Sequence, residues 1–498
     1  MKIEKLYSFI FILLGVTVNG QVRQPHSLYF METIPQISQM NPAFQPRANG
    51  YVMLPNVNFD LSSDIALKNI FQKQGDSWVT PLEIQYDYSK LRRATGKKAT
   101  MFNFAADIDL LGFGFRTDNG YFSFGCSEHV LGNFAIPSDL FKITDEGLPP
   151  GTILDFSPLR TQGMMYMQLL FGYSYKVNDK LTVGVNVKPL MGQVAVASKI
   201  DKFKLDTGNI EQWEIDAKGN FYSSGPVDVT TKVDDKGKEY IYSAELFDFD
   251  DYEINDWTNF GTSFTNPGIA FDLGASYRID ERLTVSASLN NLGFISWKNK
   301  SNLNSVTFNG KYTFSGVEFN PLGGDDFEDL LNALGDSIIE AMNYDVKHDK
   351  FKTSLTPVLH AGASYKLNEA ISVGLLSRSA FWKKGIRQSF NGSVSLQPYS
   401  FVAMNMGATW QVKGSVHFGG GFTFLLGPLQ FYLLVDNIPV YWSTLTIDDE
   451  KFMLNDNTPL YIPERFKTIT TRVGINLVFG RHGYMNKPML DKGKSSWN

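Results

Sequence analysis

The sequence predicts an all-β protein, a transmembrane antiparallel up-and-down β-barrel of about fourteen strands. Three observations predict it. A strand–turn–strand pattern recurs along the chain, its strands alternate between an apolar and a polar face, and an aromatic residue stands just before each short turn. An export signal at the N-terminus indicates delivery to the cell envelope.

The composition sets the first limits. Of 498 residues, 43% are hydrophobic, 14% aromatic and 19% charged, which excludes a disordered chain. The net charge of −5 gives no support for a nucleic-acid partner. The single cysteine, Cys126, excludes an internal disulfide and a zinc cluster of several thiolates. No apolar run after the N-terminus is long enough for a membrane-spanning helix.

The first twenty residues have the pattern of a secretory signal peptide. Lys2 and Lys5 precede the apolar run 6–18, and small or modest residues lead to Gly20. We expect residues 1–20 to be removed and the mature protein to reside in the cell outer membrane. An N-terminal membrane anchor is the alternative, and the shortness of the apolar run disfavours it.

The hairpin pattern consists of a strand, a tight polar turn and a second strand. Its turns contain Asn, Asp, Glu, Lys and Gly, which suit turn backbone conformations. The unequal spacing of the copies argues against a solenoid and favours a sheet with short turns at one end and variable loops at the other. The copies cover residues 112–121, 172–184, 274–286, 362–374 and, more loosely, 407–419.

The flanking strands have one apolar face. Leu181, Val183, Val185 and Val187 alternate with small or polar residues, as in any half-buried strand. The aromatic residue before each short turn is the sharper signal, because amphipathic rings favour the edge of a membrane. We therefore predict a periplasmic aromatic girdle of Phe115, Tyr175, Tyr277, Tyr365 and Trp410.

The predicted barrel covers residues 51–479 and is followed by a C-terminal tail over 480–498. An even strand number would place both chain ends at the short-turn end. The predicted strands are 51–62, 101–116, 121–131, 164–176, 181–197, 267–278, 282–293, 357–367, 370–381, 400–412, 415–427, 429–437, 439–447 and 467–479.

Two long loops are predicted at the extracellular end. The loop 198–266 holds an acidic cluster between Glu245 and Asp256, which a solvated loop explains better than a calcium site, because the EF-hand register is missing. The loop 294–356 contains apolar residues at helical spacing over Asp325–Met342, which predicts a short amphipathic helix packed on the barrel rim.

The last predicted strand resembles the C-terminal insertion signal of outer-membrane barrels. The matching residues are Arg472, Gly474, Leu477 and Phe479, although Phe479 is not the last residue of the chain. The alternative interpretation is one more alternating strand.

The segment 21–50 does not alternate, and its prolines at 35, 42 and 46 oppose a central strand. The stretch Asn41-Pro42-Ala43-Phe44 resembles the mature start of FadL-type hydrophobic-compound transporters and of related barrels associated with type IX secretion. The nearest resemblance is to an uncharacterised family of FadL-like predicted outer-membrane proteins. This resemblance implies that residues 21–50 form a plug in the lumen, with Asn41, Pro42, Ala43 and Phe44 as its motif.

No catalytic motif is found. The six histidines lack a metalloprotease spacing, and neither a nucleophile-elbow nor a phosphate-loop motif is present. The sequence therefore predicts no enzyme, no metal site and no cofactor. By strand parity, His360 and His417 face the polar interior as lumen-lining residues.

The preferred function is a FadL-like outer-membrane barrel that passes or binds a hydrophobic small molecule, with outer-membrane lipid around it. The main alternative is a non-transporting barrel that serves as partner or anchor for envelope proteins of a secretion or cell-surface complex. A soluble exported β protein and a barrel enzyme are the remaining hypotheses.

Overall fold

The computed structural model describes residues 25–70, 72–74, 77–79, 86–95, 98–142, 151–208, 212–225, 227–233, 239–246, 266–298, 303–314, 344–382, 385–412, 416–437, 442–445, 460–463 and 467–481. The predicted signal peptide, the helix over 325–342 and nearly all of the C-terminal tail lie outside these residues. Of the acidic cluster, only Glu245 is described.

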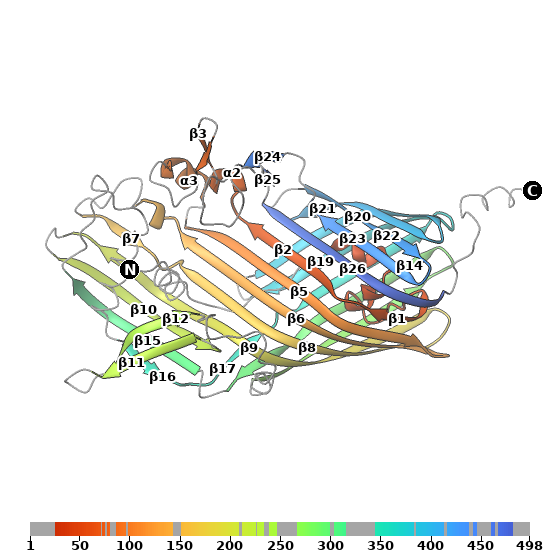
Figure 1. Cartoon of the computed structure of the whole chain (residues 1–498), viewed down its shortest axis with the longest axis horizontal. Helices are drawn as coiled ribbons and strands as arrows, with labels where there is room; N and C mark the ends of the chain where they lie inside the picture. The colour runs from red at the N-terminus through yellow and green to blue at the C-terminus, as the bar shows by residue number, and fades with distance from the viewer. Residues whose placement is uncertain are drawn as a thin grey trace, which may run out of the picture.

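The protein is a closed antiparallel β-barrel of fourteen strands (Figure 1). The first strand has two parts, and β26 pairs with both of them, which closes the ring. Around the ring lie β1 (Ala48–Met53) with β2 (Asn56–Ser63), β5 (Ala99–Arg116), β6 (Gly120–Pro137), β8 (Arg160–Lys176), β9 (Leu181–Asp206), β13 (Pro267–Arg278), β14 (Leu283–Trp297), β17 (Phe351–Ser354) with β18 (Val358–Lys366), β19 (Ile371–Trp382), β20 (Gly385–Tyr399), β21 (Val402–Gln411), β22 (Val416–Leu426), β23 (Leu429–Asp436) and β26 (Thr468–Arg481).

The predicted number of strands is confirmed, but two errors in the prediction compensate for each other. The prediction omits β20, whose residues alternate only weakly. It also counts 439–447 as a barrel strand, whereas β24 (Trp442–Leu445) pairs with β25 (Leu460–Pro463) in a separate two-stranded sheet. Local alternation does not distinguish a strand inside the ring from a hairpin outside it.

The end of the barrel away from the short turns carries further elements (Figure 1). The predicted strand 181–197 continues to Asp206, and β10 (Trp213–Ser224) and β15 (Leu303–Phe314) extend the sheet from it. The predicted long loops therefore contain strands. The other elements are β3 (Gln72–Gln74), β4 (Ser77–Val79), β7 (Ile153–Asp155), β11 (Val227–Val233), β12 (Glu239–Leu246), β16 (Tyr344–Lys347), α2 (Leu67–Ile70) and α3 (Tyr88–Ala94).

Among the described residues, no helix has the length and apolar character needed to cross a membrane. The helices of this end are short, and α3 begins at a capping residue, since the Asp87 side chain accepts hydrogen bonds from the backbone N–H groups of Ser89 and Lys90.

The short turns share one construction. The side chains of Asn178, Asp280 and Asn368 each accept two backbone N–H groups two and three residues ahead. The bonds from Leu283 and Arg282 lower the pKa of Asp280. Backbone bonds also join neighbouring turns, from Arg278 N to Lys180 O and from Lys366 N to Arg282 O. The recurring hairpin sequence therefore builds one continuous rim.

The structure places four of the five predicted girdle residues at this rim. Phe115, Tyr175, Tyr277 and Tyr365 point outward and are 37–44% exposed. Trp410 is also exposed, but its assignment to this girdle is wrong. Because β20 adds a strand, β21 runs away from the short-turn rim, and Trp410 ends it at the opposite end of the wall, paired with Val416 and stacked on Phe390.

Along most of the barrel wall the outward side chains are apolar and many inward side chains are polar. Exposed outward residues include Leu273, Phe271, Val185, Leu375, Phe422 and Leu433. The buried inward residues between them include Asn186, Asp272, Ser288, Asn405, Thr423 and Asn476. This inversion is typical of a barrel that stands in a lipid bilayer.

Leu273→Arg should destabilise the barrel in lipid vesicles by ~2–4 kcal/mol, because the charge would enter the hydrocarbon band. Ile153→Arg is the matched control, since Ile153 has a similar exposed fraction but lies on β7 beyond the main wall. Urea unfolding in vesicles measures both variants. Equal tolerance of the two charges would contradict a lipid-facing belt.

Candidate functional site: the occupied lumen

The N-terminal segment 25–47 lies inside the barrel (Figure 1). It forms two short helices, η1 (His26–Phe30) and η2 (Pro35–Gln39), whose first four residues are buried in each case. The chain then leaves the lumen to enter β1 at the short-turn end. A segment with several prolines and no alternation cannot join the sheet, and here it fills the space that the sheet encloses.

Polar side chains of the wall satisfy the backbone of this segment. Asn290 donates to the carbonyl oxygens of Gln39 and Met40 at 2.9 and 3.1 Å, and Ser288 donates to Met40 O at 2.7 Å. Gln430 donates to Thr33 O at 2.7 Å. Since buried carbonyl groups need partners, these side chains compensate for the missing ladder bonds.

The predicted plug motif packs directly against the wall. Asn41 is fully buried, accepts the Ala43 N–H at 2.9 Å, and donates to Ala275 O and Ala287 O at 3.3 and 3.2 Å. Phe44 packs edge-on against Tyr29, with ring centroids 5.0 Å apart. The motif residues therefore dock as a turn on β13 and β14.

Inward-facing glycines of the barrel make room for the segment. A Cβ atom at Gly184 or Gly274 would collide with the Asn41–Ala43 turn. At Gly362, Gly374 and Gly421 it would meet the side chains of Tyr29, Phe30 and Met31, respectively. Four of these five glycines belong to the recurring hairpin sequence. Their position on the polar face of the strands is the signal in the sequence for this close approach.

An amide cluster holds the middle of the segment. Gln36 and Asn476 exchange two hydrogen bonds, of 2.8 and 3.1 Å, and Asn476 also donates to Gln430 at 2.9 Å. All three side chains are buried. The first described residues are anchored separately, because His26 Nδ1 lies 2.6 Å from Asp436 Oδ2 and Nε2 lies 3.1 Å from Ser389 Oγ.

The Ser389, His26 and Asp436 side chains have the connectivity of a hydrolase triad. Ser389 is buried, however, and it lines neither the lumen cavity around Asn290 nor the apolar groove on the outer wall. We therefore interpret the three residues as an anchor for the segment.

The predicted insertion-signal residues divide between the two faces of β26. Leu477 and Phe479 point outward, whereas Gly474 and Arg472 point into the lumen. The Arg472 guanidinium is almost completely buried, lies 2.6 Å from Asp109 Oδ2 and donates to Gln39 Oε1 at 2.9 Å. In the folded protein Arg472 therefore joins β26, β5 and the N-terminal segment.

A second buried ion pair lies at a defect in the wall. Lys188 Nζ is 2.6 Å from Asp272 Oδ2 and 2.9 Å from Asn291 Oδ1, and Asp272 also accepts the Asn291 N–H at 2.8 Å. Asn291 has a φ of 62°, and the β13–β14 register shifts here. These bonds satisfy the polar groups that the bulge removes from the ladder.

A cavity of about 80 Å³ remains between the segment and the wall. Its apolar part consists of Met40, Leu131, Tyr166, Leu170 and Leu355. Its polar part consists of Gln39, Asp107, Asp109, Ser127, His129, Gln168, Lys188, Asn290, Asn291, Thr356, His360 and Arg378. Of the two predicted lumen histidines, His360 lines this cavity and its Nδ1 lies 3.3 Å from Ser288 Oγ, whereas His417 lies on the inward face of β22 outside the lining.

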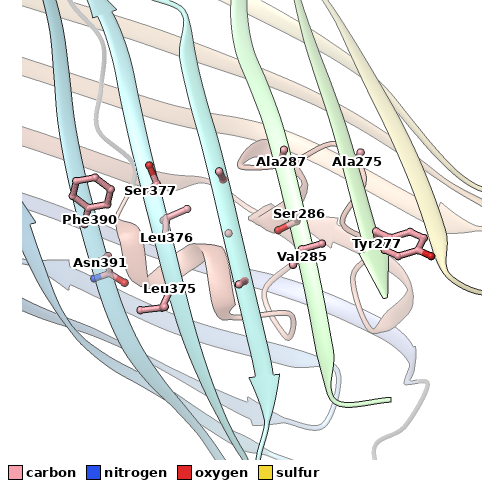
Figure 2. Close-up of a pocket in the computed structure, with 13 residues that line it drawn as sticks. Ala275, Tyr277, Val285, Ser286, Ala287, Leu375, Leu376, Ser377, Phe390 and Asn391 are labelled. Atoms are coloured by element: carbon pink, nitrogen blue, oxygen red, sulfur yellow. The ribbon is translucent and has the colours of Figure 1, made fainter. Parts of the chain in front are cut away.

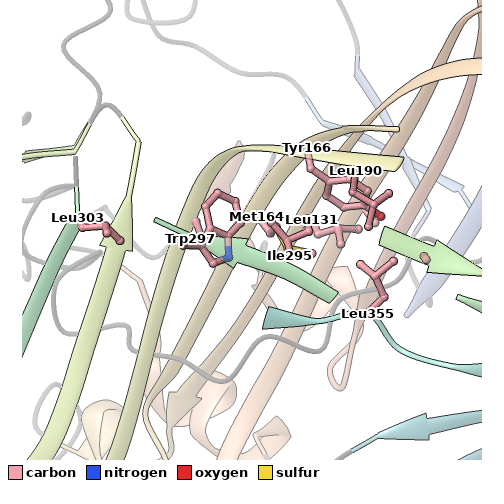
Figure 3. Close-up of a cluster of buried hydrophobic side chains, with 11 residues drawn as sticks. Leu131, Met164, Tyr166, Leu190, Ile295, Trp297, Leu303 and Leu355 are labelled. Carbon is pink, nitrogen blue, oxygen red and sulfur yellow. The ribbon is translucent and has the colours of Figure 1, made fainter. Parts of the chain in front are cut away.

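Next to the cavity the interior of the barrel is apolar. Trp297, Ile295, Leu303, Leu190 and Met164 form a buried cluster with the cavity residues Leu131, Tyr166 and Leu355 (Figure 3). The residues of the cluster come from β5, β6, β8, β9, β13, β14 and β15 and from Leu355 between β17 and β18. Hydrocarbon-like surroundings therefore adjoin the polar cavity inside the barrel.

The outer wall is hollowed where the segment packs inside. An apolar groove of about 630 Å³ crosses β13, β14, β18, β19 and β20 and is lined by Ala275, Val285, Ala287, Ala361 and Ala363, among others (Figure 2). Glycines on the inner face of the same strands adjoin the segment. The wall is thin here because both faces carry small residues.

The chain belongs to the family of unknown function DUF5723, whose model matches residues 42–436. The predicted membership of an uncharacterised family is confirmed. A search of curated proteins gives no match.

Solved structures to which the chain is similar include the toluene transporters TbuX of Ralstonia pickettii and TodX of Pseudomonas putida and a FadL homologue of Pseudomonas aeruginosa. The identities are 10%, 9% and 12%, and the TM-scores 0.41, 0.39 and 0.40. The matches cover 94%, 95% and 94% of this chain, and 97%, 97% and 98% of the other.

Gly274→Ala should lower the free energy of opening of the N-terminal segment by ~1–3 kcal/mol, because the new methyl group would overlap the Asn41 turn. Gly392→Ala is the control, since its Cβ would meet only Leu375 Cδ2 at an ordinary 3.7 Å. Hydrogen exchange of residues 25–47 measures the effect. Unchanged protection in both variants would show that the segment is not held by this contact.

Arg472→Met should destabilise the barrel by ~3–5 kcal/mol, because Asp109 would keep a buried charge without its partner. Combining it with Asp109→Leu should recover most of that loss. A double-mutant cycle of unfolding free energies in vesicles measures the coupling, and additive single effects would contradict it.

Proposed function

We propose that this protein is an outer-membrane barrel that passes a hydrophobic small molecule through a lumen closed by its N-terminal segment. The observation that carries the proposal is the apolar cluster around Trp297 inside the barrel, next to a cavity that the segment 25–47 covers. A barrel that carried only polar solutes would not need a hydrocarbon-like interior. The outward apolar belt and the aromatic rim support a place in the membrane.

The cavity reaches the barrel wall at a point where the strand ladder is interrupted. Residues 355–357 separate β17 from β18, opposite the bulge at Asn291 on β14. Leu355, Thr356, Asn290 and Asn291 all line the cavity. This interruption favours a sideways path between lumen and membrane over a path along the barrel axis, because few backbone bonds would have to open.

The protein must open before a molecule larger than the cavity can pass. The segment is held by hydrogen bonds to Ser288, Asn290, Gln430 and Asn476, and by the Asn41 turn. Each of these hydrogen bonds contributes about 0.5–1.5 kcal/mol. Displacement of the segment is therefore the gating step in this proposal.

The same closure favours a second candidate function, a barrel that anchors other envelope proteins and transports nothing. A densely bonded segment and a small residual cavity are what a permanent seal requires. In that case the outer and periplasmic surfaces would carry the function.

Deleting residues 25–45 separates the two functions. If the segment is a gate, vesicles containing the variant should take up a hydrophobic probe such as toluene faster than vesicles with the full chain, and Gly274→Ala should lie between them. Stopped-flow uptake measures the rates. Identical rates for all three proteins, with the barrel folded by its heat-dependent gel mobility, would favour the anchor.

A further inference from the structure

The lumen cavity is lined by a residue with a hydrogen-bond acceptor that has no partner among the described residues. Asn290 is buried, and its Nδ2 donates to two carbonyl oxygens, Gln39 O and Met40 O. Because both partners are acceptors, the orientation of the amide is determined. Asn290 Oδ1 is buried and unpaired among the described residues.

The cavity lining contains a second unpaired acceptor among the described residues, the ring nitrogen Nε2 of His129. His129 Nδ1 lies 2.5 Å from Asp107 Oδ1, and the imidazole stacks on Tyr166 with centroids 4.7 Å apart. In the imidazole tautomer whose Nδ1 hydrogen is directed at Asp107, Nε2 carries a lone pair. Nε2 is buried and has no partner among the described residues.

Two charged side chains of the cavity lining have partners of opposite charge, since Asp109 is paired with Arg472 and Lys188 with Asp272, each at 2.6 Å. Arg378 has an interaction of its own. A ligand carboxylate would bring a further negative charge close to Asp107 and Asp109 and would meet two further acceptors. A group that donates a hydrogen bond fits these surroundings better than an anion does.

The remaining lining is apolar and continues into the Trp297 cluster through Leu131, Tyr166 and Leu355. A cavity of about 80 Å³ accommodates a hydroxyl group or about two water molecules, but not a whole apolar ligand. The apolar body must then take the space of displaced segment residues such as Met40.

We propose that the ligand is an uncharged amphiphile, an apolar molecule whose hydroxyl group donates to Asn290 Oδ1 or His129 Nε2. This inference rests on the proposed function and narrows its substrate class. It distinguishes the lumen from one that selects pure hydrocarbons, for which the two acceptors would stay unpaired, and from one that selects carboxylic acids.

Bromine-labelled probes test the proposal, because bromine quenches the fluorescence of a nearby indole and Trp297 lies in the adjoining cluster. The full-length mature protein in phospholipid vesicles is titrated with 8-bromo-1-octanol, 1-bromooctane and 8-bromooctanoate. Trp297→Phe defines the quenching that lipid partitioning alone produces. The alcohol should saturate the quenching of Trp297 at a concentration about five- to tenfold lower than bromooctane does. The acid should bind with an affinity no higher than that of bromooctane.

Two variants assign the effect to the cavity. Asn290→Leu should bring the alcohol to the affinity of bromooctane. Asn405→Leu is the matched control, since Asn405 is also a buried lumen amide with an unpaired Oδ1 but lies outside the cavity lining. His129→Phe, which keeps a ring over Tyr166, should also weaken the alcohol and serves if Asn290→Leu does not fold.

Equal affinities of the alcohol and bromooctane, or tightest binding of the acid, would overturn the inference and leave the proposed function standing. An alcohol preference that survives in both Asn290→Leu and His129→Phe would also overturn it. Saturable quenching by none of the three probes would count against the proposed function itself.

Discussion

The closure of the backbone ladder is the constraint on which the rest of the structure depends. In a bilayer no water is present to satisfy free N–H and C=O groups, so a sheet that spans it cannot have an open edge. Here β26 pairs with β23 on one side and with β1 and β2 on the other, which joins the last strand to the first. The outward apolar belt and the enclosed polar lumen follow from this closure. Successive side chains of each strand then point alternately toward the lipid and toward the interior of the barrel.

A closed ring of this size leaves an interior that its own side chains do not fill. The N-terminal segment occupies this space, and glycines such as Gly184 and Gly274 let its backbone approach the wall closely. Buried amides and the Arg472–Asp109 pair then replace the water that a polar lumen would otherwise hold. The same residues that seal the lumen thus define the cavity and its unpaired acceptors.

Much of the fold was predictable because its signals are local. The turn residues Asn178, Asp280 and Asn368 act within three residues of themselves, so their hairpins were recognisable. The direction in which a strand runs across the barrel is not a local property, because it depends on the number of strands that precede it. The omission of β20 reversed the predicted direction of β21, which is why Trp410 was assigned to the wrong end of the barrel.

The candidate site was predicted only in part. Asn41 was predicted because the stretch Asn41–Phe44 resembles the mature start of FadL-type transporters, and His360 by strand parity, and both lie in the lumen. Lys188, Asp272 and Asp109 looked like ordinary polar alternation, because each meets its partner from a different strand.

By itself the sequence determined the barrel class, the hairpin turns and the polarity of each strand face, since all of these depend on residues that are neighbours along the chain. Only the tertiary structure decided how the ring closes, where the segment 25–47 docks, and which charges are paired. These features join residues hundreds of positions apart, such as His26 with Asp436 and Gln36 with Asn476, and no local pattern encodes which of many equivalent polar positions will meet.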